Sequence, residues 1–356
     1  MQKILIIGFG DIGSRVAEKL ASRCHLYALV RSEATAVRAR QLGAIPVMGD
    51  LDDPVSLRRL RGLADMVLHF APPLRQGTRD RRTRHLVATL NSGKILPQRL
   101  IYISTTGVYG DCQGEVVRET RPCRPTTARA VRRADAESVL RRWGAHRGVQ
   151  VSILRVPGIY APNGHARFPL PSPPPAGEGD AGSLREFHVG RLPVERLEKR
   201  VPALCAEDDA HTNHIHADDL VRIIVAAMFH GRAGRVYNAA DDTPMKMANY
   251  FDLVADYLHL ERPRRISWAE AQKEISPGML SYMNESRRIS NTRIKQELGV
   301  RLRYPGVANC LGEAPPSIMK QRSAKTVPLS PDSLPEGERD AGSLREFHVK
   351  GLAHAD

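Results

Sequence analysis

The first twenty residues contain a strand, a glycine motif and a helix in direct succession, which few folds other than a parallel α/β sheet can accommodate. The segment Lys3–Ile7 (KILII) has the continuous apolar character of a buried parallel strand. A G-x-G-x-x-G motif follows at Gly8–Gly13, and then Val16 and Leu20 continue at helical spacing. The glycines therefore lie between a strand and a helix, the context that a phosphate-binding loop requires.

Each glycine of this motif has a separate task. Gly8 allows a tight turn, Gly10 lets the backbone approach a diphosphate, and Gly13 lets the helix pack against the strand. The first helical residues, Asp11 and Ile12, begin a helix whose free N–H groups would face the phosphates. The motif predicts that a dinucleotide binds here.

The end of the second predicted strand indicates which dinucleotide is preferred. His25–Val30 (HLYALV) is followed by Arg31 and Ser32, where an NAD-selective site usually has an Asp or Glu for the ribose 2′-hydroxyl. A guanidinium suits a 2′-phosphate through charge-assisted hydrogen bonds. We therefore expect NADP to be preferred over NAD.

Strands and helices continue to alternate, which predicts βαβ units and a doubly wound parallel sheet of the α/β class. Further strands are expected at Ile45–Met48, Met66–Phe70 and Leu100–Ile103. Ligands of such sheets bind at the carboxyl ends of the strands. The candidates at that edge, in addition to the glycines and Arg31, are Asp50, Leu51, Ala71, Pro72 and Thr105.

Six motifs in the chain resemble those of the extended short-chain dehydrogenase/reductases, the NAD-dependent epimerase/dehydratase family. They are GFGDIG, GDLDD, ISTTGVYGD, LRVPGIYAP, NHIHADDL and ESRRISNTRIKQELG, in the family's order over about residues 1 to 310. The resemblance implies a Rossmann fold with a small C-terminal substrate lobe. The second half is predicted to add helices at Asp218–Met228 and Pro244–Leu258, a strand at Arg235–Ala239 between them, and a short helix at Asn291–Leu298 that closes the fold. The resemblance also implies oxidoreductase or epimerase chemistry on a sugar nucleotide or a small carbonyl or hydroxyl compound, with Pro157 among the coenzyme-binding residues.

The resemblance places Thr105 where the family binds the reacting oxygen, but the family's Y-x-x-x-K pair is missing. Residues 125–137 contain no Tyr and no Lys, and Arg129 and Arg133 occupy the two positions. Because arginine stays protonated in proteins, it cannot act as a general base near neutral pH. Arg133 could still bind a ribose or a phosphate, whereas Arg129 cannot replace a phenol.

Two interpretations of this departure remain open: an enzyme with a different acid/base group, or a nucleotide-binding redox sensor without turnover. Replacement acids and bases are possible among five nearby residues: Tyr109, Tyr160, His211, His214 and His216. The two tyrosines match structural positions of the family. His214 and His216 are two apart on a predicted strand and so share one face. We expect them to face the substrate cleft, and we expect no metal site.

The decapeptide DAGSLREFHV occurs twice, at Asp180–Val189 and Asp340–Val349, each time after a proline-rich run. A translated mobile repeat explains it best, because a structural repeat would need several units at a short period. The predicted organisation is a nucleotide-binding core at 1–164, an inserted repeat at 165–190, the remaining core and lobe at 191–312, and a disordered tail at 313–356. The insert falls near the substrate side and could cover the cleft.

The composition excludes some other functions. No apolar run approaches the length of a membrane span, and the N-terminus lacks a signal-peptide pattern, so we expect a cytoplasmic protein. The net charge of +14 raises the question of nucleic-acid binding, but the arginines are spread along the chain and predict no specific nucleic-acid partner. We expect a monomer or homodimer that binds a small-molecule substrate.

Overall fold

A computed structural model describes residues 1–161 and 192–312. Contacts divide the chain into two units, Met1–Pro315 and Pro316–Asp356, and the following description concerns the first. Both copies of the decapeptide lie outside the described residues. The predicted boundaries after 164, 190 and 312 also fall on or beside residues that are not described.

A seven-stranded, all-parallel sheet forms the centre of the first unit, in the order β12-β7-β5-β4-β1-β2-β3. This order confirms the predicted doubly wound α/β class. The strands are β1 (Lys3–Ile7), β2 (His25–Val30), β3 (Ala44–Met48), β4 (Met66–His69), β5 (Arg99–Thr105), β7 (Gln150–Val156) and β12 (Val236–Asn238). The strand order reverses between β1 and β4, and that is where doubly wound sheets bind their ligands.

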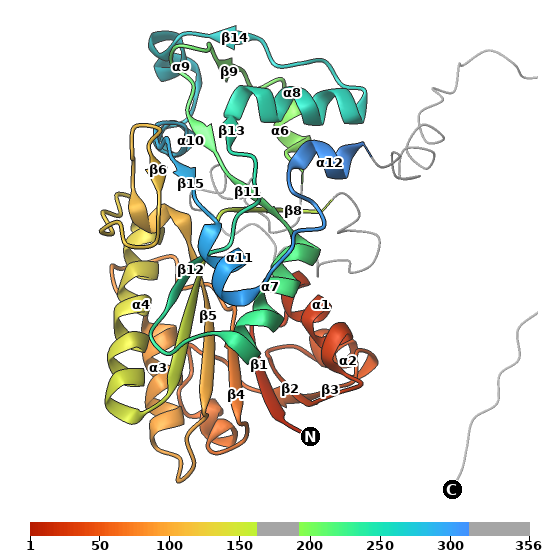
Figure 1. The fold of residues 1–356 in the computed structure, drawn as a ribbon, viewed down its shortest axis with the longest axis vertical. Helices are drawn as coiled ribbons and strands as arrows, with labels where there is room; N and C mark the ends of the chain where they lie inside the picture. Colours follow the sequence, from red (N-terminus) through yellow and green to blue (C-terminus); the bar gives the residue numbers. More distant parts are fainter. Residues whose placement is uncertain (162–191, 313–356) are drawn as a thin grey trace, which may run out of the picture. The chain divides into compact units, whose positions relative to one another are not determined.

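Alternate residues of the central strands pack against different helices, so the sheet has two covered faces (Figure 1). Ile4 and Ile6 of β1 pack in one core, while Leu5 and Ile7 pack in the other. The helices of the first face are α1 (Asp11–Leu20), α2 (Glu33–Gln41), α7 (Ala217–His230) and α11 (Thr292–Leu298). The second face is covered by the 3₁₀ helix η1 (Ser56–Leu60), α3 (Arg81–Asn91) and α4 (Ala128–Arg147).

A smaller lobe has its own apolar core, and segments from residue 192 onward supply most of it. Its helices are α6 (Val194–Glu198), α8 (Met247–Leu258), α9 (Trp268–Glu274), α10 (Pro277–Met283) and α12 (Val307–Leu311). Short strand pairs join this part together: β9 (Ala203–Leu204) with β14 (Arg265–Ile266), and β10 (His211–Thr212) with β13 (Met245–Lys246). Two more pairs are β11 (His214–His216) with β8 (Gly158–Tyr160), and β15 (Arg288–Ile289) with β6 (Val116–Val117).

Most predicted elements agree with the structure within a few residues. The predicted helix at Pro244–Leu258 begins later, at Met247, because Met245 and Lys246 pair with His211–Thr212 as strand β13. The helix then starts where the Asp209 carboxylate accepts the backbone N–H of Ala248 at 2.9 Å. Among the described residues, no helix is long and apolar enough to cross a membrane.

Candidate functional site

The three glycines of the loop after β1 differ in what surrounds them. Gly8 has a positive φ of 97°, and a Cβ there would lie 2.5 Å from the backbone nitrogen of Ala71. A Cβ on Gly13 would lie 2.7 Å from the carbonyl oxygen of Gly8. A Cβ on Gly10, by contrast, would have no atom within 4 Å. Packing therefore explains Gly8 and Gly13, whereas Gly10 faces open space, as a position does where a ligand approaches the backbone.

The first turn of α1 is fixed by an ion pair that the sequence did not reveal. Asp11 begins the helix, and the Nε of Arg15 lies 3.1 Å from its carboxylate. The Nη1 of Arg15 also contacts Asp218 at 2.5 Å, in the first turn of α7. Arg15 therefore neutralises an acidic side chain at the helix N-terminus, where negative charge would otherwise oppose a diphosphate. Ile12 points away from this edge into the first core.

At the end of β2, Arg31 is exposed, and its only ion-pair partner among the described residues is Asp50, at 3.8 Å. Ser32 caps α2 by accepting the N–H of Thr35. Arg38 was not among the predicted site residues. It contacts the glycine loop, where its Nη2 donates to the Phe9 carbonyl at 2.5 Å. Its position on a mostly exposed helix gave no signal.

Side chains of α3 hold the loops that follow β3 and β4. Arg82 pairs with Asp52 and also donates to the Pro72 carbonyl at 3.1 Å, while the carbonyl of buried Leu51 contacts His85 at 2.7 Å. Ala71 is buried against Gly8, as described above. Of these candidates, Ala71 borders the glycine loop, and it does so through its backbone.

Thr105 is the last residue of β5, and its side chain is half-buried. Its Oγ1 accepts the N–H of Gly107 at 3.2 Å, which caps the 3₁₀ helix η2 (Thr106–Tyr109). The preceding Ser104 is buried and donates to Glu137 at 2.6 Å. The adjacent β7 strand leads to Pro157, which is half-buried.

The two arginines of α4 occupy different environments. Arg129 is exposed in the first turn, whereas Arg133, one turn later, is 5% exposed. The Nη1 of Arg133 donates to the Ile103 carbonyl at 2.7 Å and to the Tyr102 hydroxyl at 3.0 Å, and lies 3.4 Å from the Ala71 carbonyl. Arg133 therefore joins the ends of β4 and β5.

A buried ion pair connects α4 with strand β7. Glu137 accepts from Arg155 of β7 at 2.7 Å, and both side chains are about 5% exposed (5% and 4%). The guanidinium of Arg155 lies 4.7 Å from the centre of the Tyr109 ring, whose hydroxyl donates to Asn238 at 2.7 Å. Burial raises the pKa of Tyr109 to about 12. These contacts give Tyr109 a structural role.

The remaining acid/base candidates lie around β8 and β11. The ring of Tyr160 meets those of His214 and His216 edge-on, with centroids 6.3 and 5.3 Å away, so these histidines share a face as predicted. Burial lowers the pKa of His214 to about 3 and that of His216 to about 4. His216 caps α7, and His211 contacts Ser286. Among the described residues, His, Cys, Asp and Glu form no cluster of three that could hold a metal.

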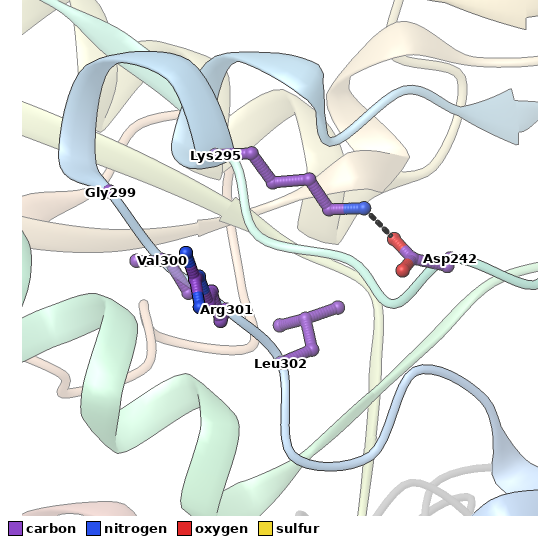
Figure 2. A pocket seen from close by; sticks show the side chains of 6 residues that line it. All are labelled: Asp242, Lys295, Gly299, Val300, Arg301 and Leu302. Atoms are coloured by element: carbon purple, nitrogen blue, oxygen red, sulfur yellow. Dashed lines mark hydrogen bonds and ion pairs between the residues drawn. The ribbon is translucent and has the colours of Figure 1, made fainter.

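A cavity of about 530 Å³ lies beside α11, apart from the predicted coenzyme residues (Figure 2). In it, Lys295 forms an ion pair with Asp242 at 2.5 Å. Its lining residues are Asp242, Lys295, Gly299, Val300, Arg301 and Leu302. The cavity includes the carboxyl end of α11, which presents carbonyl groups rather than the N–H donors that bind phosphates.

The family model for the NAD-dependent epimerase/dehydratase family matches residues 4–240. The chain belongs to this family. Protein YeeZ of Escherichia coli is 24% identical over 317 residues, covering 86% of this chain and 97% of YeeZ. GDP-6-deoxy-D-mannose reductase of Pseudomonas aeruginosa is 27% identical over 247 residues, covering 64% and 77%.

A solved structure supports the fold independently. The UDP-glucuronic acid 4-epimerase of Bacillus cereus, in complex with NAD, aligns with a TM-score of 0.63 and 16% identity, covering 87% of this chain and 96% of that one. The predicted resemblance and the predicted Rossmann-type fold are thus both confirmed, and the family is one that depends on NAD.

Proposed function

We propose that this protein is an NADP(H)-preferring oxidoreductase that reduces a carbonyl group of a sugar nucleotide or a small carbonyl compound. The observation that carries the proposal is the contrast among the loop glycines, with Gly8 and Gly13 closely packed and Gly10 facing open space. A backbone loop of this shape, next to the N-terminus of α1, suits a diphosphate. The bound coenzyme would supply the hydride.

The preference for NADP rests on Arg31. Its guanidinium is exposed, and Asp50 at 3.8 Å is too far for a direct hydrogen bond. The side chain can therefore turn toward a 2′-phosphate without losing a strong contact. Arg38 adds a second cation at the same end of the crevice, beside Phe9 of the glycine loop.

The substrate end would depend on Thr105. Its Oγ1 accepts a hydrogen bond from Gly107, so its O–H group can donate to a substrate oxygen. Arg129, in the exposed first turn of α4, would stabilise negative charge on that oxygen. The proton would come from water, since no phenol stands at the family's usual position. The reductase relative supports reduction of a sugar nucleotide.

A second candidate function is a coenzyme-binding sensor without turnover. The burial of Arg133 favours it, because this side chain bonds to backbone carbonyls and a phenol of its own sheet. Such an arrangement holds strands together and supplies no exchangeable proton near neutral pH.

Enzyme and sensor can be separated with the full chain. NADPH oxidation is followed by absorbance in the presence of keto-sugar nucleotides and small ketones. An enzyme consumes NADPH with at least one of them, and Thr105→Val lowers the rate about 100-fold, in the range of one lost transition-state donor. The exposed Thr126, which contacts Glu285, gives the control Thr126→Val, which should keep the rate. NADPH binding without turnover on any compound would support the sensor.

A further inference from the structure

Arg133 is a buried cation with no carboxylate partner. Its side chain is 5% exposed, and within the described part of the chain no Asp or Glu lies within 4.0 Å of its guanidinium. Carboxylates on its own helix and on a neighbouring one are engaged elsewhere: Glu137 with Arg155, and Asp80 with the Thr83 hydroxyl at 2.8 Å. A buried and unpaired charge is poorly screened, so it acts on whatever binds beside it.

The position of Arg133 relative to the coenzyme crevice follows from two contacts. Its Nη1 lies 3.4 Å from the Ala71 carbonyl, and a Cβ on Gly8 would lie 2.5 Å from the Ala71 nitrogen. Ala71 therefore lies between Arg133 and the glycine loop, with its carbonyl toward the first and its nitrogen toward the second. Nη1 also donates to the Ile103 carbonyl, two residues before Thr105. Arg133 thus lies under the β4–β5 side of the strand-order reversal, opposite Arg31.

That side is where the nicotinamide would lie if the proposed function holds, since Arg31 would take the adenosine end and the glycine loop the diphosphate between them. The oxidised nicotinamide ring carries a positive charge, and the reduced ring carries none. The carboxylates of Asp80 and Glu137 act on Tyr102 in the sense opposite to Arg133, but the two rings nearest to Arg133 carry no charge. Burial and the Arg133 charge lower the pKa of His69 to about 3, and burial raises that of Tyr102 to about 12, so both are neutral near pH 7.

We infer that Arg133 sets the redox selectivity of the site, so that the protein binds the reduced coenzyme more tightly than the oxidised one. This inference rests on the proposed function, and it deepens that function by stating which redox form of the coenzyme the site retains. A protein that retains NADPH rather than NADP⁺ already carries its hydride donor when a carbonyl substrate arrives.

The test compares dissociation constants for NADPH and NADP⁺, measured by calorimetry on the full chain at pH 7.5. We expect NADPH to bind about tenfold or more tightly, as a partly screened buried charge allows. Arg133→Met should bring the two constants within about twofold of each other, whereas Arg133→Lys, which keeps the charge, should retain the preference. Arg132 is a buried cation that donates to the Gly77 carbonyl instead, so Arg132→Met should also retain it.

Equal affinities in the wild-type protein, or an unchanged preference in Arg133→Met, would overturn the inference and leave the proposed function intact. Absence of binding by either form would overturn both. If Arg133→Met does not fold, the midpoint potential of the coenzyme bound to the wild-type protein decides. A tenfold preference places it about 30 mV more positive than the free couple, and an unshifted potential contradicts the inference.

Discussion

The two ends of the proposed coenzyme site follow the family pattern to different degrees. At the glycine-loop end, Gly8, Gly10 and Gly13 keep the motif, and backbone packing explains two of the three. At the α4 end, arginines stand where the family has its Tyr and Lys, and Arg133 bonds to the sheet itself. The glycine motif is thus kept, while a buried, permanently charged arginine stands where the resemblance places the family's Lys. This difference teaches that coenzyme binding and catalysis must be tested separately.

The largest expected effect is at the α4 end, where Glu137→Ala would leave Arg155 buried without its carboxylate. Both side chains are about 5% exposed, and breaking such a pair costs about 3–5 kcal/mol of unfolding free energy. Urea denaturation measures the loss. Glu261 pairs with Arg200 on the surface, so Glu261→Ala should cost less than about 1 kcal/mol. Equal losses in the two variants would show that the buried pair is not important for stability.

At the glycine-loop end, one glycine-to-alanine substitution should lower stability, and a second should lower coenzyme affinity. Gly8→Ala places a Cβ 2.5 Å from the Ala71 nitrogen at a positive φ, and should destabilise the fold by about 3 kcal/mol. Gly10→Ala meets no atom within 4 Å, so it should leave thermal unfolding nearly unchanged and weaken NADPH binding about tenfold or more. Full NADPH affinity in Gly10→Ala would mean that the ligand does not approach this loop.

The α4 end should also respond to pH through His69. Burial and the Arg133 charge lower its pKa to about 3 in the folded protein, against about 6.5 when unfolded. Its contribution to the free energy of unfolding is complete above pH 6.5. It is lost as the pH falls toward 3, because the unfolded chain binds a proton in this range and the folded chain does not. The slope is at most about 1.4 kcal/mol per pH unit.

Unfolding free energies of the wild type and of His69→Gln at pH 7 and pH 5 isolate this term, since burial also lowers the pKa values of His214 and His216. His69→Gln cannot titrate and should lose less stability between the two values than the wild-type protein, whereas a substitution of the exposed His25 should behave like the wild type. The comparison with a variant is needed because burial raises the pKa of Asp241 to about 8, which gives a pH dependence of opposite sign. Identical slopes for wild type and His69→Gln would contradict the assignment.

The smallest expected effect distinguishes the coenzymes. Arg31→Ala should weaken NADPH binding about tenfold and change NADH binding less than twofold, because only the former has a 2′-phosphate for the guanidinium to bind. Calorimetric titration with both coenzymes measures this. Equal weakening of NADPH and NADH binding would mean that Arg31 contacts a part of the coenzyme that both molecules have.

The sequence predicted the backbone of the site better than its side-chain contacts. The strands and the glycine loop follow from local patterns, and the structure has the strands where expected. The strand order, with its reversal between β1 and β4, became known only from the structure. Sequence patterns could not show that Arg38 donates to Phe9, that Arg15 joins Asp11 to Asp218, or that Arg133 bonds to Ile103. Apart from Arg15–Asp11, an i,i+4 pair within α1, these contacts join segments that come together only in the fold, and each uses an arginine in a chain with many.

The missing Tyr and Lys also show that a sequence pattern can reveal a residue's identity without its environment. Their absence was visible in residues 125–137, but the placement of Arg129 and Arg133 in different environments was not. Helical spacing puts these two residues on one side of α4, one turn apart. Only the packing of α4 against β5 buries one and exposes the other.

The most direct measurement of whether this protein holds a dinucleotide is a calorimetric titration of NADPH into the full chain and into Gly10→Val. Binding of one NADPH per chain in the wild type, weakened at least tenfold when the valine fills the space in front of Gly10, is the result we expect. No heat with NADPH, NADP⁺, NADH or NAD⁺, or an unaltered affinity in Gly10→Val, would contradict it.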